Sequence, residues 1–173
     1  MTVSALIALV LAALCLYAAF SHSRRTQSDK VFNLFQLDPD EYELLGFDLG
    51  DGSRKVTVRG LGLIGAPDAL FRRRRDGRLL VGDFKTRRFR GNPSKYERFQ
   101  MVLYMGVASH QYQAPADALL RYACGHLEPV DFDPGCFEEL RAHIGPLLKA
   151  EAKFDRSGRR APRRRRGVAQ ISR

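Results

Sequence analysis

Two aspartates and a lysine occupy positions from which their side chains could meet. Asp83 and Lys85 are two residues apart, so on a β-strand both side chains project from the same face. Asp76-Gly77 is a strong hairpin turn, and Asp68 lies on the arm of that hairpin opposite Asp83. The spacing therefore predicts two carboxylates and one ammonium group at the ends of adjacent strands.

Such a set of groups suits the hydrolysis of a phosphodiester bond. Neighbouring carboxylates repel each other and raise each other's pKa, and a divalent cation such as Mg²⁺ or Mn²⁺ relieves that repulsion. A bound metal lowers the pKa of water, while a lysine can orient the hydroxide or stabilise the transition state. The plain alternative is that Asp83 and Lys85 form a surface ion pair that contributes little to stability.

The surrounding segments predict a mixed α/β sheet with helices against it. Asp38-Pro39 is a typical helix start, and Gly46 a typical end. Ser94 with Glu97 three residues later predicts a capping box. The predicted order is a helix over residues 38–45, strands over 55–64, 68–74 and 78–85, a helix over 94–110, strands over 118–124 and 127–132, and a helix over 134–153.

The N-terminal residues 3–20 form an uncharged apolar run. As a helix these residues would span roughly 27 Å, enough for the hydrocarbon layer. A cleaved signal peptide would need basic residues before the run, whereas here Arg24 and Arg25 follow it. We therefore expect a single-pass anchor, in a bacterial inner membrane, with the C-terminal domain cytoplasmic.

Basic residues give the chain a formal net charge of +10. Arginine clusters at residues 72–75 and 156–173 indicate a polyanionic partner, nucleic acid or anionic lipid. Beside the predicted site, residues 72–75 favour contact with a DNA backbone. The tail over residues 155–173 is expected to be disordered, and it could bind DNA, which we favour, or the inner leaflet.

Two motifs resemble those of one known family. Pro67-Asp68 followed by Asp83-Phe84-Lys85 resembles the signature of the PD-(D/E)XK nuclease superfamily. The run Gln100-Met101-Val102-Leu103-Tyr104 resembles the Q-x-x-x-Y element of its RecB-like branch. The resemblance covers residues 38–132 and implies a restriction-endonuclease-like fold, a mixed sheet core flanked by helices.

The resemblance also implies roles for single residues. Asp68 and Asp83 would bind Mg²⁺ or Mn²⁺ together with the backbone carbonyl of Phe84, and Lys85 would be the catalytic lysine. Gln100 and Tyr104, one helical turn apart, would contact the DNA backbone or brace the site. An upstream ligand would be Glu41 or Glu43, with a slight preference for Glu41. The DNA-binding arginines would be Arg72, Arg73, Arg74, Arg75, Arg87 and Arg88.

Other relatives hold an iron–sulfur cluster with four cysteines, whereas this chain has three. Their spacing suits neither a disulfide framework nor a zinc site, so we expect reduced thiols and no cluster. The chain also lacks an ATPase motif, which suggests that a protein partner delivers the DNA.

Together these inferences predict a membrane-anchored, metal-dependent DNA nuclease. The division is an anchor (residues 1–21), a juxtamembrane linker (22–37), a nuclease domain (38–154) and the tail (155–173). Single-stranded ends are a common substrate of the family, and both exonuclease and endonuclease action stay open. The alternatives are a catalytically silent, DNA-binding membrane tether or scaffold, and a nuclease that acts on RNA.

Overall fold

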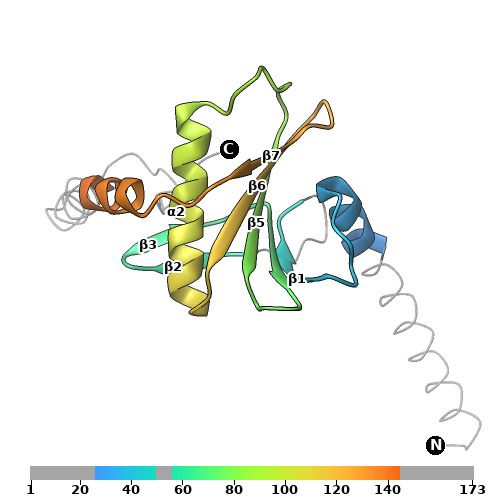
Figure 1. The fold of residues 1–173 in the computed structure, drawn as a ribbon, viewed down its shortest axis with the longest axis horizontal. Helices are drawn as coiled ribbons and strands as arrows, with labels where there is room; N and C mark the ends of the chain where they lie inside the picture. The colour runs from blue at the N-terminus through green and yellow to red at the C-terminus, as the bar shows by residue number, and fades with distance from the viewer. Residues whose placement is uncertain (1–25, 50–55, 145–173) are drawn as a thin grey trace, which may run out of the picture.

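The computed structural model describes residues 26–49 and 56–144, which form a five-stranded sheet with helices on both faces (Figure 1). The strand order is β1-β4-β5-β6-β7, and only β5 and β6 are parallel. Helix α2 makes the crossover between these two strands. The bounds are β1 Tyr42–Phe47, β4 Ala69–Arg73, β5 Leu79–Lys85, α2 Lys95–Tyr112, β6 Ala116–Tyr122 and β7 Leu127–Val130.

Most of the predicted elements are confirmed. The hairpin turns at Asp76-Gly77 between β4 and β5, with Gly77 at a positive φ of 72°. Ser94 and Glu97 form the predicted capping box at the start of α2. Strands β6 and β7 follow in the expected places. The last predicted helix is present over residues 134–144, and its remaining part lies outside the described residues.

Two predictions of secondary structure are wrong. Instead of the predicted helix over residues 38–45, Asp38 begins a turn and β1 runs from Tyr42 to Phe47. Pairing with β4 overrides the local helix signals, and Gly46 lies at a break in the register of that pairing. Residues 55–64 were expected to form one strand. They contain β2 (Val58–Gly60) and the start of β3 (Leu63–Gly65), because Leu61 and Gly62 turn with positive φ.

A helix over residues 26–35 occupies part of the segment that was expected to be a linker. Val31, Phe32 and Phe35 on this helix are buried, and they pack against Phe71 of β4 in the core on one face of the sheet. Gly82 of β5 permits this close packing, because a Cβ atom there would lie 2.8 Å from the ring of Phe35. The packed core therefore includes residues ahead of Asp38.

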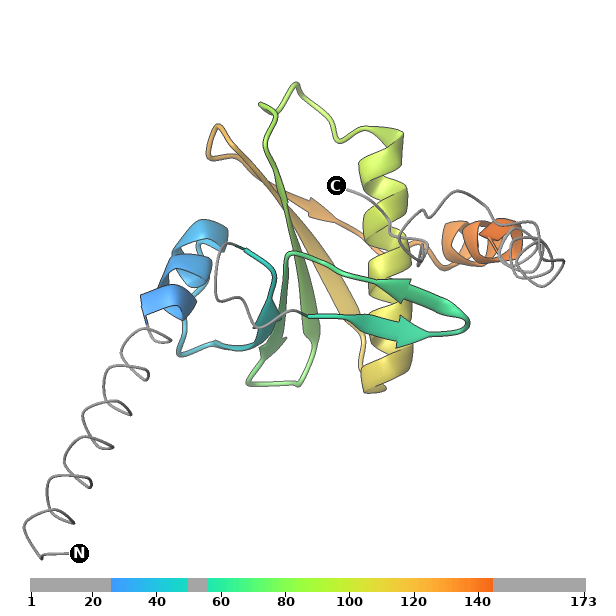
Figure 2. The same cartoon turned by 180° about the vertical axis from the view of Figure 1, so that it is seen from behind.

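Helix α2 covers the opposite face of the sheet (Figures 1 and 2). Leu79 and Val81 of β5 belong to the core that packs on α2. Because side chains alternate along a strand, the same face continues through Asp83 to Lys85. The carboxylate of Asp83 and the ammonium group of Lys85 therefore both point towards α2.

The hairpin of β2 and β3 lies across the outer side of α2 (Figure 2). At Gly65 a Cβ atom would lie 2.6 Å from the ring of Tyr104. Only a residue without a side chain allows the hairpin to approach α2 so closely. This contact holds the loop that leads from β3 to Asp68 against the helix.

Over residues 26–49 and 56–144, no helix is long and apolar enough to cross a membrane. The predicted anchor over residues 3–20 and the arginine-rich tail lie outside the described residues.

Candidate active site

Asp68 and Asp83 lie side by side at one end of the sheet. Ala69 pairs with Gly82 in the antiparallel ladder of β4 and β5. Asp68, directly before Ala69, therefore lies opposite Asp83, directly after Gly82. Both aspartates are buried, with exposed fractions of 5% and 3%. The Phe84 backbone N–H donates a hydrogen bond of 2.7 Å to Oδ2 of Asp68, which fixes this carboxylate against β5.

Lys85 links the carboxylate of Asp83 to α2. Its Nζ lies 2.6 Å from Oδ2 of Asp83 and donates a hydrogen bond of 2.7 Å to Oε1 of Gln100. Gln100 Nε2 donates to the Tyr104 hydroxyl at 3.1 Å, and this hydroxyl donates to the Ala66 carbonyl at 3.2 Å. A continuous set of polar contacts thus runs from β5 through α2 to the loop that carries Asp68.

Gln100 and Tyr104 are almost fully buried, with exposed fractions of 2% and 1%. Burial raises the pKa of the Tyr104 hydroxyl well above its usual range, so the hydroxyl keeps its proton and serves as a donor. Of the two sequence-based interpretations, bracing of the site and contact with a DNA backbone, this burial favours bracing.

A cavity of about 140 Å³ opens beside the two carboxylates. Asp68, Asp83, Lys85 and Thr86 line it, together with Leu49 and Phe84. Mg²⁺ is commonly held by one or two carboxylates and keeps several of its waters. Two buried carboxylates beside a cavity of this size therefore fit a hydrated Mg²⁺ or Mn²⁺ ion.

The backbone of Phe84 offers a third oxygen ligand. The Lys85 carbonyl accepts a hydrogen bond from Ala123 N, on the β6 side of β5. Because backbone groups alternate between the two edges of a strand, the Phe84 carbonyl faces the other edge, where Asp68 lies. Within residues 26–49 and 56–144, no group of three His, Cys, Asp or Glu side chains could hold a metal, so a backbone carbonyl and water would complete the ligand set.

The structure does not bring the expected upstream ligand to this site. Tyr42 pairs with Arg73, whereas Phe47 pairs with Ala69, so Glu41 and Glu43 lie at the end of β1 that is remote from Asp68. The preference for Glu41 as a metal ligand is therefore wrong. The resemblance implied an upstream acidic ligand, and the predicted helix over residues 38–45 carried Glu41, whereas this segment forms a turn and β1.

Asp48 is the acidic residue at the end of β1 that lies beside Asp68, and it was not singled out from the sequence. Its backbone N–H donates a hydrogen bond of 2.7 Å to the Asp68 carbonyl. The signal that could have revealed it is an acidic residue directly after the apolar strand end at Phe47. The interpretation of this segment as a helix concealed that signal.

The arginines of residues 72–75 do not adjoin the site. They lie where β4 runs into the hairpin turn, and at about 3.3 Å per residue Arg72 is roughly 13 Å along the strand from Asp68. Arg72 lies 3.9 Å from Glu43, and Arg73 is ion-paired with Asp76 at 2.6 Å. The expectation that these arginines adjoin the active centre is wrong, because strand and turn carry them to the opposite end of the sheet. Their contact with DNA stays a prediction.

Arg87 lies near the site, but its guanidinium is engaged within the protein. It donates two hydrogen bonds to the carboxylate of Glu97 and lies over the Tyr122 ring, 4.9 Å from its centroid. Burial opposes ionisation of Glu97, but the hydrogen bonds from Arg87 and Ser94 outweigh it and lower the pKa of Glu97 to about 2. This ion pair ties the end of β5 to the first turn of α2, whereas Arg88 is exposed.

Comparisons with known proteins point to one family. The model of the PD-(D/E)XK nuclease superfamily matches residues 6–167. A solved structure titled "Crystal structure of SSO0001" is similar with a TM-score of 0.37 and 17% sequence identity. The match covers 76% of this chain and 61% of that one, so the chain spans less than two thirds of its length. No curated protein matches the sequence.

Proposed function

Because the chain belongs to the PD-(D/E)XK nuclease superfamily, we propose that it is a metal-dependent nuclease that hydrolyses DNA phosphodiester bonds. The observation that carries the proposal is the convergence of Asp68, Asp83 and Lys85 beside one cavity. A binding domain has no need for two buried carboxylates whose repulsion a cation must offset.

Asp68 and Asp83 would hold Mg²⁺ or Mn²⁺ together with the Phe84 carbonyl. The bound metal supplies a water of lowered pKa and neutralises charge on a phosphoryl oxygen. Lys85 lines the same cavity, where its ammonium group would stabilise negative charge on the phosphate. Gln100 accepts a hydrogen bond from that ammonium group, and Tyr104 orients the amide of Gln100.

The pairing of Gln100 with Tyr104 supports a place in the RecB-like branch, whose Q-x-x-x-Y element these residues resemble. We expect no iron–sulfur cluster, since the chain has three cysteines and such a cluster takes four. The chain has no ATPase motif, so we propose that a protein partner delivers the DNA.

Cleavage by the full chain, purified in mild detergent, tests the proposal. Linear and circular DNA and RNA are incubated with Mg²⁺, Mn²⁺ or EDTA, beside Asp83→Ala and Lys85→Ala. We expect DNA cleavage that needs the metal and both side chains. Asp76→Ala is the matched control, since it removes a carboxylate at the far end of the β4–β5 hairpin and should leave cleavage unchanged. Cleavage by Asp83→Ala at the parental rate would refute the assignment, and DNA binding without any cleavage would favour a tether.

We further propose that residues 3–20 anchor the nuclease to the inner membrane with the domain on the cytoplasmic side. The support is the length of the uncharged run and the position of Arg24 and Arg25 after it. Sodium carbonate extraction of membranes and protease treatment of spheroplasts test this topology. We expect the chain to stay in the carbonate-resistant pellet and to resist protease added from outside.

A further inference from the structure

The connection from β5 to α2 and the first turns of that helix expose an unusual mixture of side chains. Tyr96 and Phe99 are 54% and 42% exposed, and they are two of the four large hydrophobic side chains that the described residues expose. Four exposed cations accompany them within residues 88–99: Arg88, Arg90, Lys95 and Arg98. We call this set of six side chains the aromatic–basic surface.

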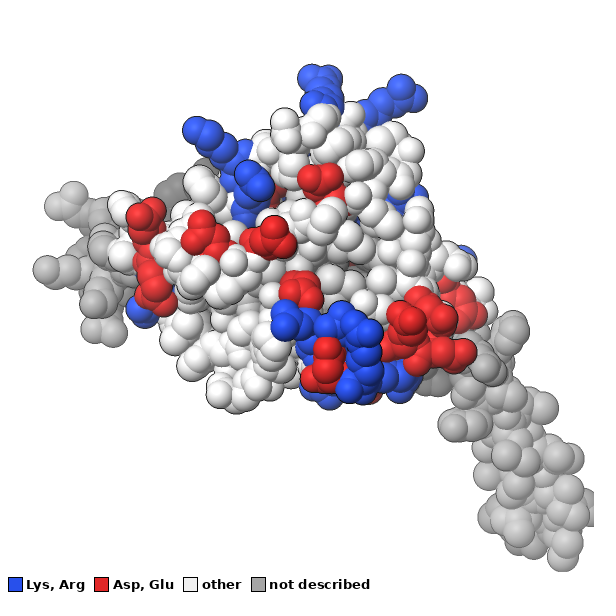
Figure 3. All heavy atoms as spheres, viewed as in Figure 1, with Lys and Arg blue, Asp and Glu red and all other residues white. Residues whose placement is uncertain are grey.

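The segment that forms this surface carries little acidic charge of its own. The only acidic residue in the segment is Glu97, which is buried and paired with Arg87. Among the described residues, no ion pair involves any of the four cations of the surface. Figure 3 shows the difference: basic side chains project at the top, over the β5–α2 connection, whereas those at the bottom are interleaved with acidic ones.

The surface begins directly after the active centre. Arg88 follows Lys85 by three residues along the chain. On α2, Tyr96 lies one helical turn before Gln100, so the two share a face of the helix, and the Gln100 side chain contacts Lys85. A polyanion that lies along this surface would therefore lead to the cavity beside Asp68 and Asp83 without crossing an acidic stretch of the segment.

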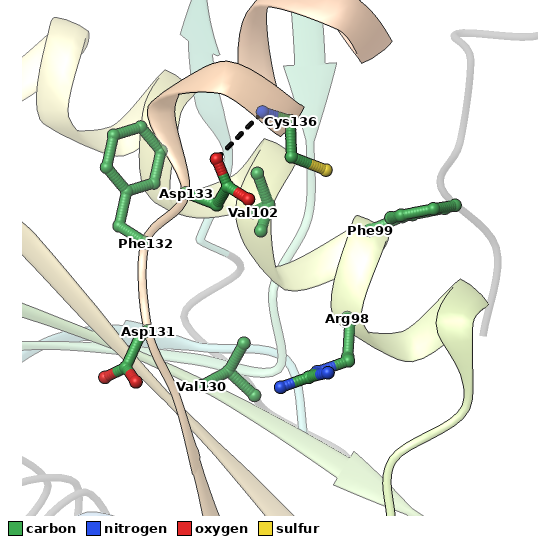
Figure 4. Close-up of a pocket in the computed structure, with 8 residues that line it drawn as sticks. All are labelled: Arg98, Phe99, Val102, Val130, Asp131, Phe132, Asp133 and Cys136. Atoms are coloured by element: carbon green, nitrogen blue, oxygen red, sulfur yellow. Dashed lines mark hydrogen bonds between the residues drawn. The ribbon is translucent and has the colours of Figure 1, made fainter.

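Next to Phe99 the surface opens into a cavity of about 290 Å³ (Figure 4). Arg98 and Phe99 line one side, and Phe132 and Asp133 lie across from them. The carboxylates of Asp131 and Asp133 would repel a phosphate group, whereas an aromatic ring and an acceptor suit a nucleobase. The cavity thus offers room for a base while the phosphates stay on the cationic side.

We propose that the aromatic–basic surface binds an unpaired DNA strand and leads it into the active centre, an inference that rests on the proposed nuclease function. Exposed aromatic rings stack on bases whose faces are accessible, as they are in a single strand, while cations bind the backbone. In a duplex these faces are covered by neighbouring bases. Tyr96 and Phe99 take the bases, and Arg88, Arg90, Lys95 and Arg98 take the phosphates.

Binding is measured with the full chain carrying Asp83→Ala, so that the labelled oligonucleotide stays intact. We expect the unpaired DNA strand to bind more tightly than a duplex or an RNA of the same length. Tyr96→Leu/Phe99→Leu keeps apolar bulk but removes the rings, and should weaken single-strand binding by at least about tenfold. The same strand without bases should bind the parent and this variant alike.

The arginines have a matched control elsewhere on the chain. Arg88→Ala/Arg90→Ala and Arg74→Ala/Arg75→Ala remove equal charge from exposed positions at opposite ends of the sheet. Log affinity falls as log salt concentration rises, and Arg88→Ala/Arg90→Ala should reduce the steepness of this fall by about 1.4 for a single strand. Arg74→Ala/Arg75→Ala should leave the steepness unchanged. Equal effects of the two pairs, or a preference for duplex DNA or RNA, would overturn the proposal.

Failure of this proposal can be told apart from failure of the nuclease assignment. Tyr96→Leu/Phe99→Leu in an otherwise unchanged chain should cleave single strands with a raised KM and a nearly unchanged kcat. If the parent cleaves DNA in a metal-dependent manner but this variant shows the parental KM, the surface is wrongly assigned while the nuclease stands. If the parent cleaves nothing, the nuclease assignment fails, and with it this inference.

Discussion

The Lys85 ammonium group donates a hydrogen bond of 2.7 Å to the side-chain carbonyl of Gln100, although the two residues lie on different elements and are fifteen positions apart. Gln100 is buried, and its own amide is held by the Tyr104 hydroxyl. The orientation of the lysine on β5 is therefore set by α2. A change that shifts α2 relative to β5 should therefore lower the rate of cleavage even where the protein stays folded.

Loss of the Gln100 acceptor tests this relationship. Gln100→Leu keeps most of the volume but leaves Lys85 without its partner on α2, so kcat should fall by about 10- to 100-fold, as when other supporting partners of a catalytic group are removed. The Kd for DNA should stay nearly constant. Gln100→Glu keeps an acceptor and should retain more activity than Gln100→Leu. Steady-state cleavage rates and DNA binding measure both effects, and equal losses in the two variants would contradict a positioning role.

The two buried carboxylates should make stability depend on divalent metal. Binding of Mg²⁺ to the folded state alone raises stability by mass action, so the Tm of the parent should rise with Mg²⁺ concentration. In Asp68→Asn and Asp83→Asn this rise should largely disappear, because a ligand is lost. Thermal unfolding with and without Mg²⁺ measures it. Asp117→Asn, which alters an exposed pair with Arg78, is the control and should keep the full shift.

The ion pair of Glu97 with Arg87 should make stability depend on acid pH. The pKa of Glu97 is about 2 in the folded protein against an ordinary value of 4.5. A lowered pKa in the folded state gives stability that is present above about 4.5 and lost as the pH falls towards 2. Glu97→Gln cannot titrate, so it should be less stable than the parent by about 1–3 kcal/mol at pH 7. The difference should shrink steadily below pH about 4.5.

Urea unfolding of the two proteins at several pH values measures this difference. Glu138→Gln serves as the control, because the pair of Glu138 with Arg141 is exposed on the helix over residues 134–144. Its stability should follow that of the parent across the whole range. A constant gap between Glu97→Gln and the parent from pH 7 down to pH 3 would show that ionisation of Glu97 contributes nothing.

Two glycines, Gly65 packed against α2 and Gly106 within α2, separate damage to the site from damage to the fold. A Cβ atom at Gly65 would lie 2.6 Å from the Tyr104 ring, and one at Gly106 would lie 2.2 Å from the Phe137 ring. Each alanine substitution should cost about 1–3 kcal/mol of stability through overpacking. Gly65→Ala also displaces Tyr104 and should lower kcat, whereas Gly106→Ala should leave kcat unchanged at temperatures where it stays folded. Unfolding and cleavage assays on both variants test this, and equal losses of kcat would contradict it.

Much of the fold could be predicted because its signals are local. Asp76-Gly77 fixes a hairpin turn, and Ser94 with Glu97 fixes the first turn of α2. The position of β1 could not be predicted in this way. Its pairing with β4 overrides a helix signal at Asp38-Pro39, and such pairing depends on residues that are distant in the sequence.

The sequence by itself determined which groups share one strand face, since the spacing of Asp83 and Lys85 fixes their side and the hairpin turn fixes the arm that carries Asp68. Only the tertiary structure decided which other groups join them. In the folded chain Gln100 contacts Lys85, and Arg87 is paired with Glu97. Glu41 and the arginines of residues 72–75 lie at the far end of the sheet. The physical reason is that the spacing of residues along one strand fixes the face to which their side chains point. Which residues of different elements come close depends instead on how those elements pair and pack.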